Sequence, residues 1–344
     1  MRKEITMTTI KEIAEKAGYS PATVSRLLNN DTNLSITADT KNKILEIANQ
    51  LGYWKNHERK KLKPTIALLY RDDDTEQLQD EYFTSLKDKV NEITKREKLE
   101  IHTFHDISEL IKKATNFQGF IAIGTNKPEI LEMKRLHEVL PNGVFIDTNP
   151  MPKLFDTVKP NLALTVEDAV DRVVEAGYKR VGFLGISEKL NHMRDVRNVA
   201  FNECMWKFAD KIEDNYEIVY AKQYSVEEGY RSGKKFLEDM KNDKVKLPDV
   251  IISASDTLTA GLLQAFNEKG INVPKDIAVV SINNSKVANF VSPPLSSYNV
   301  DQDKMVELAM QLLIDHIMDP KRQPVEMLLN TELVVRKSFV PKGR

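Results

Sequence analysis

The sequence predicts an N-terminal all-α helix-turn-helix head joined to a two-lobed α/β body with parallel sheets. Three observations support this prediction. Short amphipathic patterns with helix start and stop signals occupy roughly the first 54 residues. A basic segment ends at Pro64, where the composition changes. Beyond it, short apolar runs alternate with helical patterns, as in parallel sheets covered by helices. With 344 residues, 41% of them hydrophobic, the chain is long enough for several cores.

Composition excludes several classes of protein. One cysteine allows no internal disulfide and no thiolate cluster, which is typical of a reducing cytoplasm. No apolar run is long enough to cross a membrane, so we expect a cytoplasmic protein with no membrane partner. The net charge of −1 is an average, since residues 1–63 carry 12 Lys and Arg against 7 Asp and Glu, whereas the rest carries 38 against 44. The predicted head is therefore the basic part of the chain.

The first two helices of the head have clear signals. Thr9 and Glu12 form a predicted capping box, followed by an apolar stripe that ends at Gly18. Ser20 and Pro21 then suit the N-cap and first position of a second helix. The predicted buried residues of these helices are Ile10, Ile13, Ala14 and Ala17 in the first and Val24, Leu27 and Leu28 in the second.

A third helix is predicted after Thr37, with an apolar stripe formed by Ile44, Ile47, Ala48 and Leu51 and a stop at Gly52. Two helices joined by a tight turn and supported by a third form a helix-turn-helix domain, whose second helix enters the major groove. The same pattern also suits any small three-helix bundle with a polar outer face.

The polar face of the second helix carries the chemistry for reading DNA. Arg26 can donate two parallel hydrogen bonds to a guanine edge. Pro21 and Ala22 can only make apolar contacts, for instance with thymine methyl groups. The remaining polar candidates on or beside this helix suit phosphate oxygens, and they are Ser20, Ser25, Asn29 and Thr37.

The segment TIKEIAEKAGYSPATVSRLLN at positions 9–29 resembles the signature of the lac/gal repressor family of bacterial transcription regulators. The resemblance continues through residues 40–44 and 48–53, whereas residues 1–6 have no counterpart in the family pattern. It implies that Pro21, Ala22 and Arg26 read bases. It also implies a sugar-sensing body of the periplasmic-binding-protein fold, and a short hinge helix that places a leucine of each subunit in the minor groove.

The predicted hinge covers residues 55–63, between a DNA-binding domain at 1–54 and an effector-binding and dimerisation domain at 64–344. Five cations in these nine residues suit the DNA backbone, with Lys60 as a phosphate contact. Leu62 occupies the position of the family's intercalating leucine. The segment departs from the family pattern because it has Lys55, His57, Glu58 and Arg59 where proline and small residues are usual.

The body is predicted to form two similar α/β lobes facing a cleft. Lobe 1 is expected to comprise about 64–162 and 293–325, and lobe 2 about 163–292 and 326–344. The predicted strands are the apolar runs at 66–70, 120–123, 144–146, 181–184, 250–252 and 278–282. The predicted helices include 86–93, 166–176 and 258–266.

Ligands of open α/β sheets bind beyond the carboxyl ends of the strands. Asp147, Asp256 and Asn283 follow predicted strands, while Arg197 and Phe201 share a helix face and can place a guanidinium beside an aromatic ring. Such groups suit the hydroxyls and the apolar face of a sugar. A carboxylate after a strand can equally be a helix N-cap. The resemblance implies effector contacts from Asp147, Arg197 and Asn283, with pocket lining from Tyr82, Phe201, Ser255 and Asp256.

We therefore predict a homodimeric repressor that binds a pseudo-palindromic operator in double-stranded DNA. A sugar or related metabolite, with galactose or a galactoside favoured, would release or tighten that binding. Two alternatives remain open at this stage. The body could respond to a partner protein, with a vestigial pocket, or it could be an enzyme acting on a sugar or nucleotide.

The sequence offers no support for a cofactor, a metal or a catalytic residue. His102 and His105 are three residues apart, which is not the spacing of a helical zinc motif. Phosphate-binding glycine motifs are absent, and Cys204 is best interpreted as a core residue.

Overall fold

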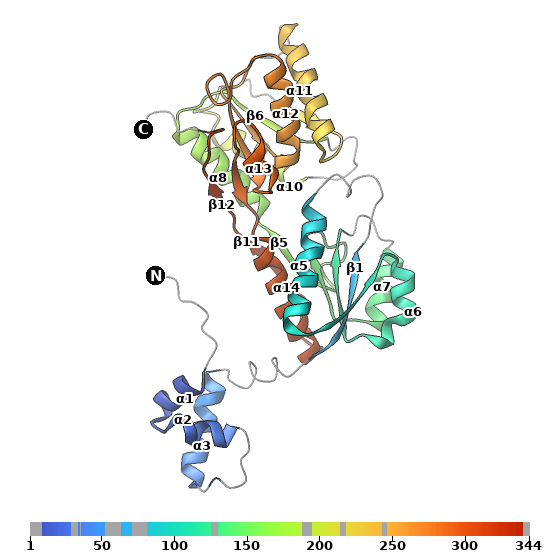
Figure 1. Ribbon diagram of the computed structural model, residues 1–344, viewed down its shortest axis with the longest axis vertical. Helices are drawn as coiled ribbons and strands as arrows, with labels where there is room; N and C mark the ends of the chain where they lie inside the picture. Colours follow the sequence, from blue (N-terminus) through green and yellow to red (C-terminus); the bar gives the residue numbers. More distant parts are fainter. Residues whose placement is uncertain are drawn as a thin grey trace. The chain divides into compact units, whose positions relative to one another are not determined.

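The computed structural model divides the chain into two units, Met1–Pro64 and Thr65–Arg344. It describes residues 9–28, 34, 36–51, 63–70, 81–124, 130–187, 195–213, 218–242 and 246–339. No helix among these residues is long and apolar enough to span a membrane. Figure 1 shows each unit.

The head unit contains the three predicted helices, α1 (Ile10–Ala17), α2 (Pro21–Leu28) and α3 (Ala38–Gln50). The capping box at α1 is confirmed, because the Glu12 backbone N–H donates to Thr9 Oγ1 and the Thr9 N–H donates to Glu12. Gly18 ends α1 with a φ of 78°, in the left-handed region that glycine adopts without strain. The helices pack around a core formed by Ile13, Ala14, Ala17, Val24, Leu28, Ile44 and Ala48.

The body contains two six-stranded sheets (Figure 1). The sheet of lobe 1 has the order β11-β5-β4-β3-β1-β2 and is parallel throughout. Its strands are β1 (Thr65–Tyr70), β2 (Glu100–Phe104), β3 (Gly119–Ile123), β4 (Gly143–Ile146), β5 (Asp156–Pro160) and β11 (Glu326–Leu329).

The sheet of lobe 2 has the order β12-β10-β9-β8-β6-β7, with β12 antiparallel to β10 and the other pairs parallel. Its strands are β6 (Val181–Ile186), β7 (Ile218–Ala221), β8 (Val250–Ser253), β9 (Ala278–Asn283), β10 (Ser296–Asn299) and β12 (Glu332–Val334). The predicted α/β body with parallel sheets is therefore confirmed, apart from this one antiparallel edge strand.

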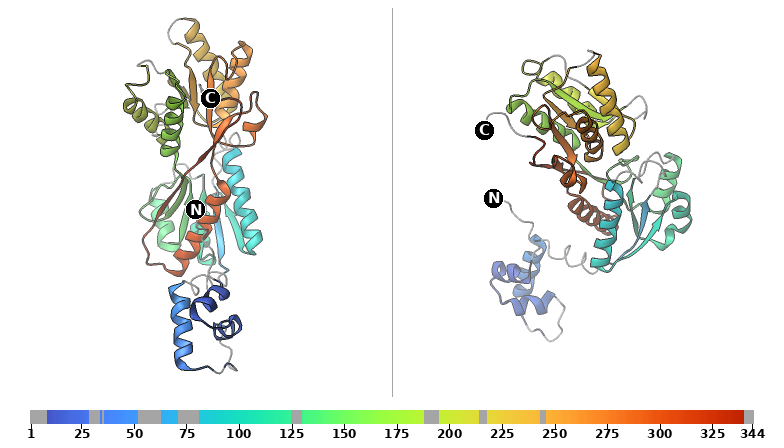
Figure 2. Two further views of the ribbon diagram at one scale, coloured as in Figure 1. Left: turned by 90° about the vertical axis from the view of Figure 1, so that its left-hand side faces the viewer. Right: turned by 45° about the horizontal axis from the view of Figure 1, so that its top comes forward.

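Helices cover both faces of each sheet. In lobe 1, α5 (Glu81–Glu97) and α14 (Gln302–Met318) cover one face, while α6 (Ile107–Lys113), the short 3₁₀ turn η1 (Ala114–Asn116) and α7 (Ile130–Val139) cover the other. Strand β1 shows the reason, since Ile66 and Leu68 pack with α5 and the alternating Ala67 and Leu69 pack with α6. Figure 2 shows α5 and α14 beside this sheet from two further directions.

In lobe 2, α8 (Leu162–Glu175) and α10 (Val196–Lys207) cover one face, and α11 (Val226–Lys241) and α12 (Asp256–Glu268) cover the other. The single turn α13 (Val287–Phe290) follows β9. Helices α11 and α12 approach so closely that a Cβ at Gly229 would lie 2.0 Å from the Leu258 carbonyl oxygen. Glycine is therefore required at this contact.

The predicted lobe boundaries need correction. Strand β10 (Ser296–Asn299) was expected in lobe 1 but pairs with β9 of lobe 2, and β11 (Glu326–Leu329) was expected in lobe 2 but pairs with β5 of lobe 1. The chain thus crosses between lobes near residues 161, 300–301 and 330–331. Both misplaced strands are four residues long, and long-range pairing rather than local pattern decides which sheet such a strand joins.

Candidate DNA-reading helix and effector site

The second helix of the head has the surface expected of a DNA-reading helix. The Ser20 hydroxyl accepts a hydrogen bond from the Thr23 backbone N–H at 3.1 Å, so Ser20 is the N-cap as predicted. Pro21, Ala22 and Arg26 are exposed, whereas Val24 is buried. The side chains expected to read bases thus lie on the surface of α2 and leave its apolar stripe in the core.

The flanking candidates have mixed outcomes. Ser25 is partly exposed on α2. Thr37 caps α3, because its hydroxyl accepts from the Thr40 N–H at 3.2 Å. Asn29, Lys60 and Leu62 lie outside the described residues, as does most of the predicted hinge. Their assigned contacts with DNA stay predictions.

In the body, Arg197 and Asp147 form the centre of the candidate effector site. Asp147 directly follows β4 of lobe 1, and Arg197 lies in the first turn of α10 in lobe 2. Their charges are close enough for each to shift the pKa of the other. The structure therefore brings together, from different lobes, two residues that are 50 positions apart in the sequence.

The guanidinium of Arg197 is held by three groups of lobe 2. It donates to both carboxylate oxygens of Asp195, at 2.9 and 2.8 Å, and to the Ala254 carbonyl oxygen at 3.0 Å. It also donates to the Tyr224 hydroxyl and lies over the Tyr224 ring, 4.6 Å from its centroid. The Tyr224 hydroxyl in turn donates to Asp195 at 2.5 Å. This closed network fixes the direction of the guanidinium.

Electrostatics agree with this geometry. Burial by itself would raise the pKa of Asp195, but the adjacent Arg197 charge and its hydrogen bonds hold that pKa well below its usual range. The same pairing raises the pKa of Arg197 against the effect of burial. Lobe 2 therefore presents a fixed ion pair, with an aromatic ring beside it, at the edge of the site.

The pKa of Asp147 is shifted in the opposite direction to that of Asp195. Burial raises its pKa, and this effect exceeds the opposing influence of the Arg197 charge and of the neighbouring Tyr82 side chain. Its backbone φ of 77° lies in the left-handed region, which is sparsely populated by residues other than glycine and is often associated with functional sites. Tyr82, on α5, thus contacts the predicted effector residue and is itself largely buried.

Asn283 occupies the corresponding position in lobe 2, at the carboxyl end of β9. It also has a positive φ, of 108°, and is partly exposed. Asp147 and Asn283 are therefore left-handed polar residues at strand ends of the two lobes, where ligands of open α/β sheets bind. Their roles as effector contacts remain proposals.

Three predicted pocket residues, Phe201, Ser255 and Asp256, are buried in this structure. Phe201 does not accompany Arg197, because it is fully buried and stacks on Phe183 with ring centroids 4.8 Å apart. The ring beside the guanidinium belongs to Tyr224. Ser255 and Asp256 are 1% and 0% exposed, so neither lines a pocket surface in this structure.

The side chains of Ser255 and Asp256 form hydrogen bonds within lobe 2. The Ser255 hydroxyl caps α12 by accepting from the Leu258 N–H at 3.2 Å. Asp256 accepts from the Ser285 N–H at 2.7 Å and from the Ser297 hydroxyl at 2.6 Å. The N-cap of α12 is thus Ser255 and not Asp256, whose carboxylate instead binds Ser285 and Ser297.

Sequence reasoning missed Asp195 and Tyr224. Asp195 is the N-cap of α10, and its side chain accepts from the Arg197 N–H, so a capping signal before that helix could have identified it. Tyr224 lies between β7 and α11, beyond the carboxyl end of a strand. The strand-end rule could have found it, but its side chain meets Arg197 only through the tertiary fold.

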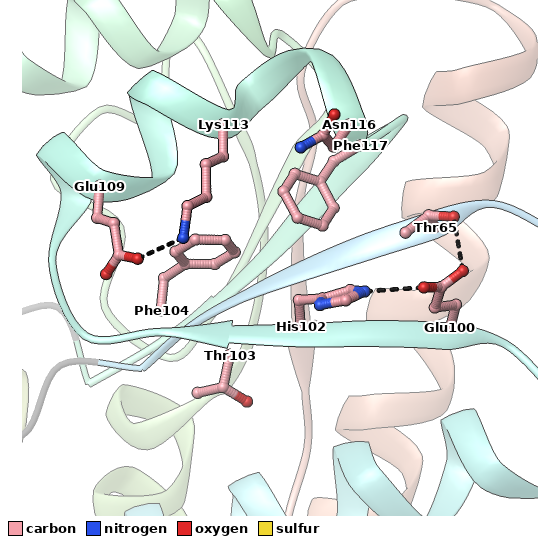
Figure 3. A pocket seen from close by; sticks show the side chains of 9 residues that line it. All are labelled: Thr65, Glu100, His102, Thr103, Phe104, Glu109, Lys113, Asn116 and Phe117. Atoms are coloured by element: carbon pink, nitrogen blue, oxygen red, sulfur yellow. Dashed lines mark hydrogen bonds and ion pairs between the residues drawn. The ribbon is translucent and has the colours of Figure 1, made fainter.

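Two cavities among the described residues lie away from this site. One of about 480 Å³ is lined by Thr65, Glu100, His102, Thr103, Phe104, Glu109, Lys113, Asn116 and Phe117 (Figure 3). Its polar side chains already bind one another, Lys113 with Glu109 at 2.7 Å and His102 with Glu100 at 2.9 Å. The other, of about 530 Å³, lies beside α12 and α13.

Metal and thiol chemistry have no support in the described part of the chain. No cluster of three or more His, Cys, Asp or Glu residues there could hold a metal ion. Burial raises the pKa of the Cys204 thiol to about 11, in agreement with its interpretation as a core residue.

Comparisons with known proteins match both units. Residues 9–56 match the model for bacterial regulatory proteins of the lacI family, and residues 170–339 match a periplasmic binding protein-like domain. The transcriptional regulator LacR of Lactobacillus helveticus is 53% identical over 98% of this chain and 100% of its own length. The chain belongs to the lacI family. Another lacI-family relative, the regulator GanR of Bacillus subtilis (strain 168), is 37% identical over 97% of this chain and 100% of its own length.

Solved lacI-family structures share the fold. The complex of the regulator CelR with cellobiose has a TM-score of 0.65 at 21% identity and covers 96% of this chain and 100% of its own. The Lac repressor bound to ONPG has a TM-score of 0.62 at 16% identity and covers 97% and 100%. The relatives are HTH-type transcriptional regulators and not enzymes, so this chain is a transcriptional regulator and the enzyme alternative is removed.

Proposed function

We propose that the chain is a cytoplasmic repressor that binds a pseudo-palindromic operator as a homodimer and changes its operator affinity when a galactoside occupies the site between Asp147 and Arg197. One observation carries this proposal, namely that these two residues from different lobes lie close enough for the charge of each to shift the pKa of the other. A ligand that contacts both lobes favours one lobe arrangement over another. By linkage, the ligand can change operator affinity by no more than the difference between its own affinities for the two lobe arrangements.

The chemistry of the site suits a sugar. The Arg197 guanidinium donates hydrogen bonds, the Asp147 carboxylate accepts them, and the Asn283 amide does both. The Tyr224 ring beside Arg197 offers an apolar face of the kind that packs on a pyranose. Asn283 is neutral, so it bonds hydroxyls more weakly than a carboxylate would.

Galactose or a galactoside is the effector class that we favour. A structural neighbour from Arthrobacter sp. FB24 was solved with lactose, at a TM-score of 0.65 and 18% identity, and covers 80% of this chain and 99% of its own. Together with the cellobiose complex, it supports a sugar built from two pyranose rings.

Dimerisation follows from operator geometry, because one head with few base contacts binds too weakly to be selective. The body offers a candidate face for it. Phe290 is 85% exposed and is adjacent in sequence to Val291, which lines the cavity beside α12 together with Ala260 and Leu263. An exposed ring near a hollow with an apolar side, formed by Ala260, Leu263 and Val291, suits a two-fold contact in which each ring enters the partner's hollow.

The test measures binding of the full-length protein to labelled DNA from upstream of its own operon by fluorescence anisotropy. Galactose, lactose, cellobiose and ribose are added in turn, with glucose as a reference sugar. We expect a change in operator affinity of roughly tenfold or more with galactose or lactose. If none of these sugars changes operator affinity or binds the protein in calorimetry, sugar sensing is wrong and control by a partner protein becomes the better hypothesis.

A further inference from the structure

Residues Asn283 and Asn284 form a corner immediately after the buried part of β9. Both have positive φ values, 108° and 53°. Two successive left-handed residues other than glycine are costly and persist only where surrounding contacts hold them. The corner therefore needs a specific set of restraints, and the structure shows what they are.

Both the nitrogen and the oxygen of the Asn284 side-chain amide form hydrogen bonds within the protein. Its amide nitrogen donates to Asn299 Oδ1 at 2.9 Å, and its oxygen accepts from a terminal nitrogen of Arg336 at 2.7 Å. Its backbone N–H donates to the Ser297 hydroxyl at 3.0 Å. Both polar ends of the amide are thus engaged away from the predicted ligand, in contrast to the proposed role of Asn283.

The partners of Asn284 lie next to the segments that cross between the lobes. Asn299 is the last residue of β10, directly before the crossing at 300–301, and the Val300 N–H donates to the Asn283 carbonyl oxygen at 3.3 Å. Arg336 follows β12, which the chain enters from the crossing at 330–331. Two of the three crossings are therefore tied to the corner that carries Asn283.

Arg336 is itself fixed by lobe 2. Its guanidinium also donates to the Leu295 carbonyl oxygen at 2.7 Å, and its backbone N–H donates to the Ser296 hydroxyl at 2.8 Å. The planar guanidinium can donate to the Leu295 carbonyl oxygen and to the Asn284 amide oxygen at once, which a lysine cannot do in the same geometry. Arg336 follows β12, which comes after the crossing at 330–331. It thus connects that strand to the start of β10, which comes before the crossing at 300–301, and to the Asn284 amide.

We propose that Asn284 and Arg336 are positioning residues, which hold Asn283 in the conformation that contacts the effector and link that contact to the lobe crossings. The proposal rests on the proposed function for the identity of the ligand, but the linkage itself is a property of the apoprotein. A change of lobe angle moves segments 300–301 and 330–331, and through Asn299 and Arg336 it disturbs the same amide. Effector contact at Asn283 and lobe arrangement then share one set of hydrogen bonds.

The variants are Arg336→Met, Asn284→Ala, their double variant, and the conservative Asn284→Asp. In Asn284→Asp, the introduced carboxylate keeps an acceptor for Arg336, and Asn299 can turn its amide to donate to it. The matched control is Arg180→Met, which removes the ion pair of Arg180 with Asp249 at 2.8 Å. Arg180 precedes β6, so it lies at the opposite, amino-terminal end of the same sheet.

The first measurement is amide hydrogen exchange of the full-length protein without sugar. We expect exchange at residues 283–286 to accelerate roughly tenfold in Arg336→Met and Asn284→Ala, and to change less than about twofold in Asn284→Asp and Arg180→Met. Equal acceleration in Arg180→Met, or no acceleration in Arg336→Met, would overturn the positioning role whether or not a sugar binds.

The second measurement is the affinity for galactose and lactose by calorimetry. We expect the two single variants to bind the effector sugar roughly tenfold more weakly, and the double variant to bind it no more weakly than the worse single variant. Additive losses would show that the residues act separately and would contradict the linkage. If neither sugar binds the wild-type protein, the proposed function fails, while the exchange result still decides the positioning role.

Discussion

The Arg197 guanidinium lies 4.6 Å from the centroid of the Tyr224 ring, although the two residues are 27 positions apart. Asp195 connects them, because it accepts hydrogen bonds from both. This triad fixes the cation that lobe 2 presents to Asp147 of lobe 1. The proposed effector site is therefore pre-organised in lobe 2, and the ligand need not supply the free energy to order it.

Replacing Arg197 tests the centre of the site. Arg197→Ala removes the proposed donor and leaves the Asp195 carboxylate without its cation, so we expect sugar affinity to fall by about 2–4 kcal/mol. Calorimetry with galactose and lactose measures this change. Arg172→Ala, which breaks an exposed pair with Asp168, is the control and should bind the sugar normally. Unchanged sugar binding in Arg197→Ala would contradict the site.

Two substitutions of Tyr224 distinguish the contribution of its aromatic ring to sugar binding from that of its hydroxyl. Tyr224→Phe keeps the ring but loses the hydrogen bond to Asp195, so we expect a loss of about 1 kcal/mol in sugar affinity. Tyr224→Ala also removes the aromatic face and should cost roughly 1 kcal/mol more. The same pair of substitutions at Tyr230, whose hydroxyl donates to Glu268 at 3.0 Å, should leave sugar binding unaltered. Equal sugar affinity in Tyr224→Phe and Tyr224→Ala would exclude a role for the ring.

Asp147 predicts a specific dependence of stability on pH. Its pKa is raised above the ordinary value of 3.8 by burial, so between 3.8 and the raised pKa the folded protein retains a proton that the unfolded chain has released. Stability therefore falls as pH rises through this window, by at most about 1.4 kcal/mol per pH unit. Asp147→Asn should remove this decline. Urea unfolding of both proteins across the window measures it, and parallel stability profiles would refute the assignment.

Asp256 should contribute to stability and not to ligand contact. Asp256→Ala leaves the buried Ser297 hydroxyl and the Ser285 N–H without their acceptor, so we expect the free energy of unfolding to fall by about 2–5 kcal/mol. Denaturant unfolding measures the loss. Any loss of sugar affinity should accompany the loss of stability, because Asp256 also holds Ser285 and Ser297 beside the Asn283–Asn284 corner. A selective loss of sugar binding at unchanged stability would restore Asp256 as a pocket residue.

Arg26 and Lys60 test the division between base reading and phosphate binding. Arg26→Ala should weaken operator binding by about 1–3 kcal/mol and relax the preference at one base pair. Lys60→Ala should weaken all sequences alike and flatten the dependence of affinity on salt. Anisotropy titrations on operator variants at several salt concentrations make the comparison. Identical, sequence-independent losses in both variants would contradict base reading by Arg26.

Local signals predicted the head closely. The Thr9–Glu12 capping box, the Ser20 N-cap and the stop at Gly18 act within a few residues of sequence, and all three occur in the structure. In the body, fully apolar runs such as 66–70 predicted strands because both faces of a covered parallel sheet are buried. The strand ends then located Asp147 and Asn283 at the edges of the two sheets.

The remaining features depend on contacts between distant segments. Strands β10 and β11 joined the lobes opposite to those predicted, since a four-residue strand takes its place from its pairing partners. Phe201 shares a helix face with Arg197 but turns into the core, where stacking on Phe183 buries the whole ring. Helical spacing alone cannot distinguish a residue that faces the core from one that faces a ligand.

The sequence by itself determined the architecture of this regulator, the exposed face of α2 that we propose to read DNA, and the strand ends at which we propose that an effector binds. These features follow from local periodicity, capping and apolar runs. Only the tertiary structure decided which side chains meet there. It brought Tyr224 and Asp195 into contact with Arg197, and it placed Asp256 within hydrogen-bond distance of Ser297. It also brought Asn284 to Arg336, which lies 52 positions away in the sequence. Such hydrogen bonds depend on distances between strands and helices, and no local pattern in the sequence encodes those distances.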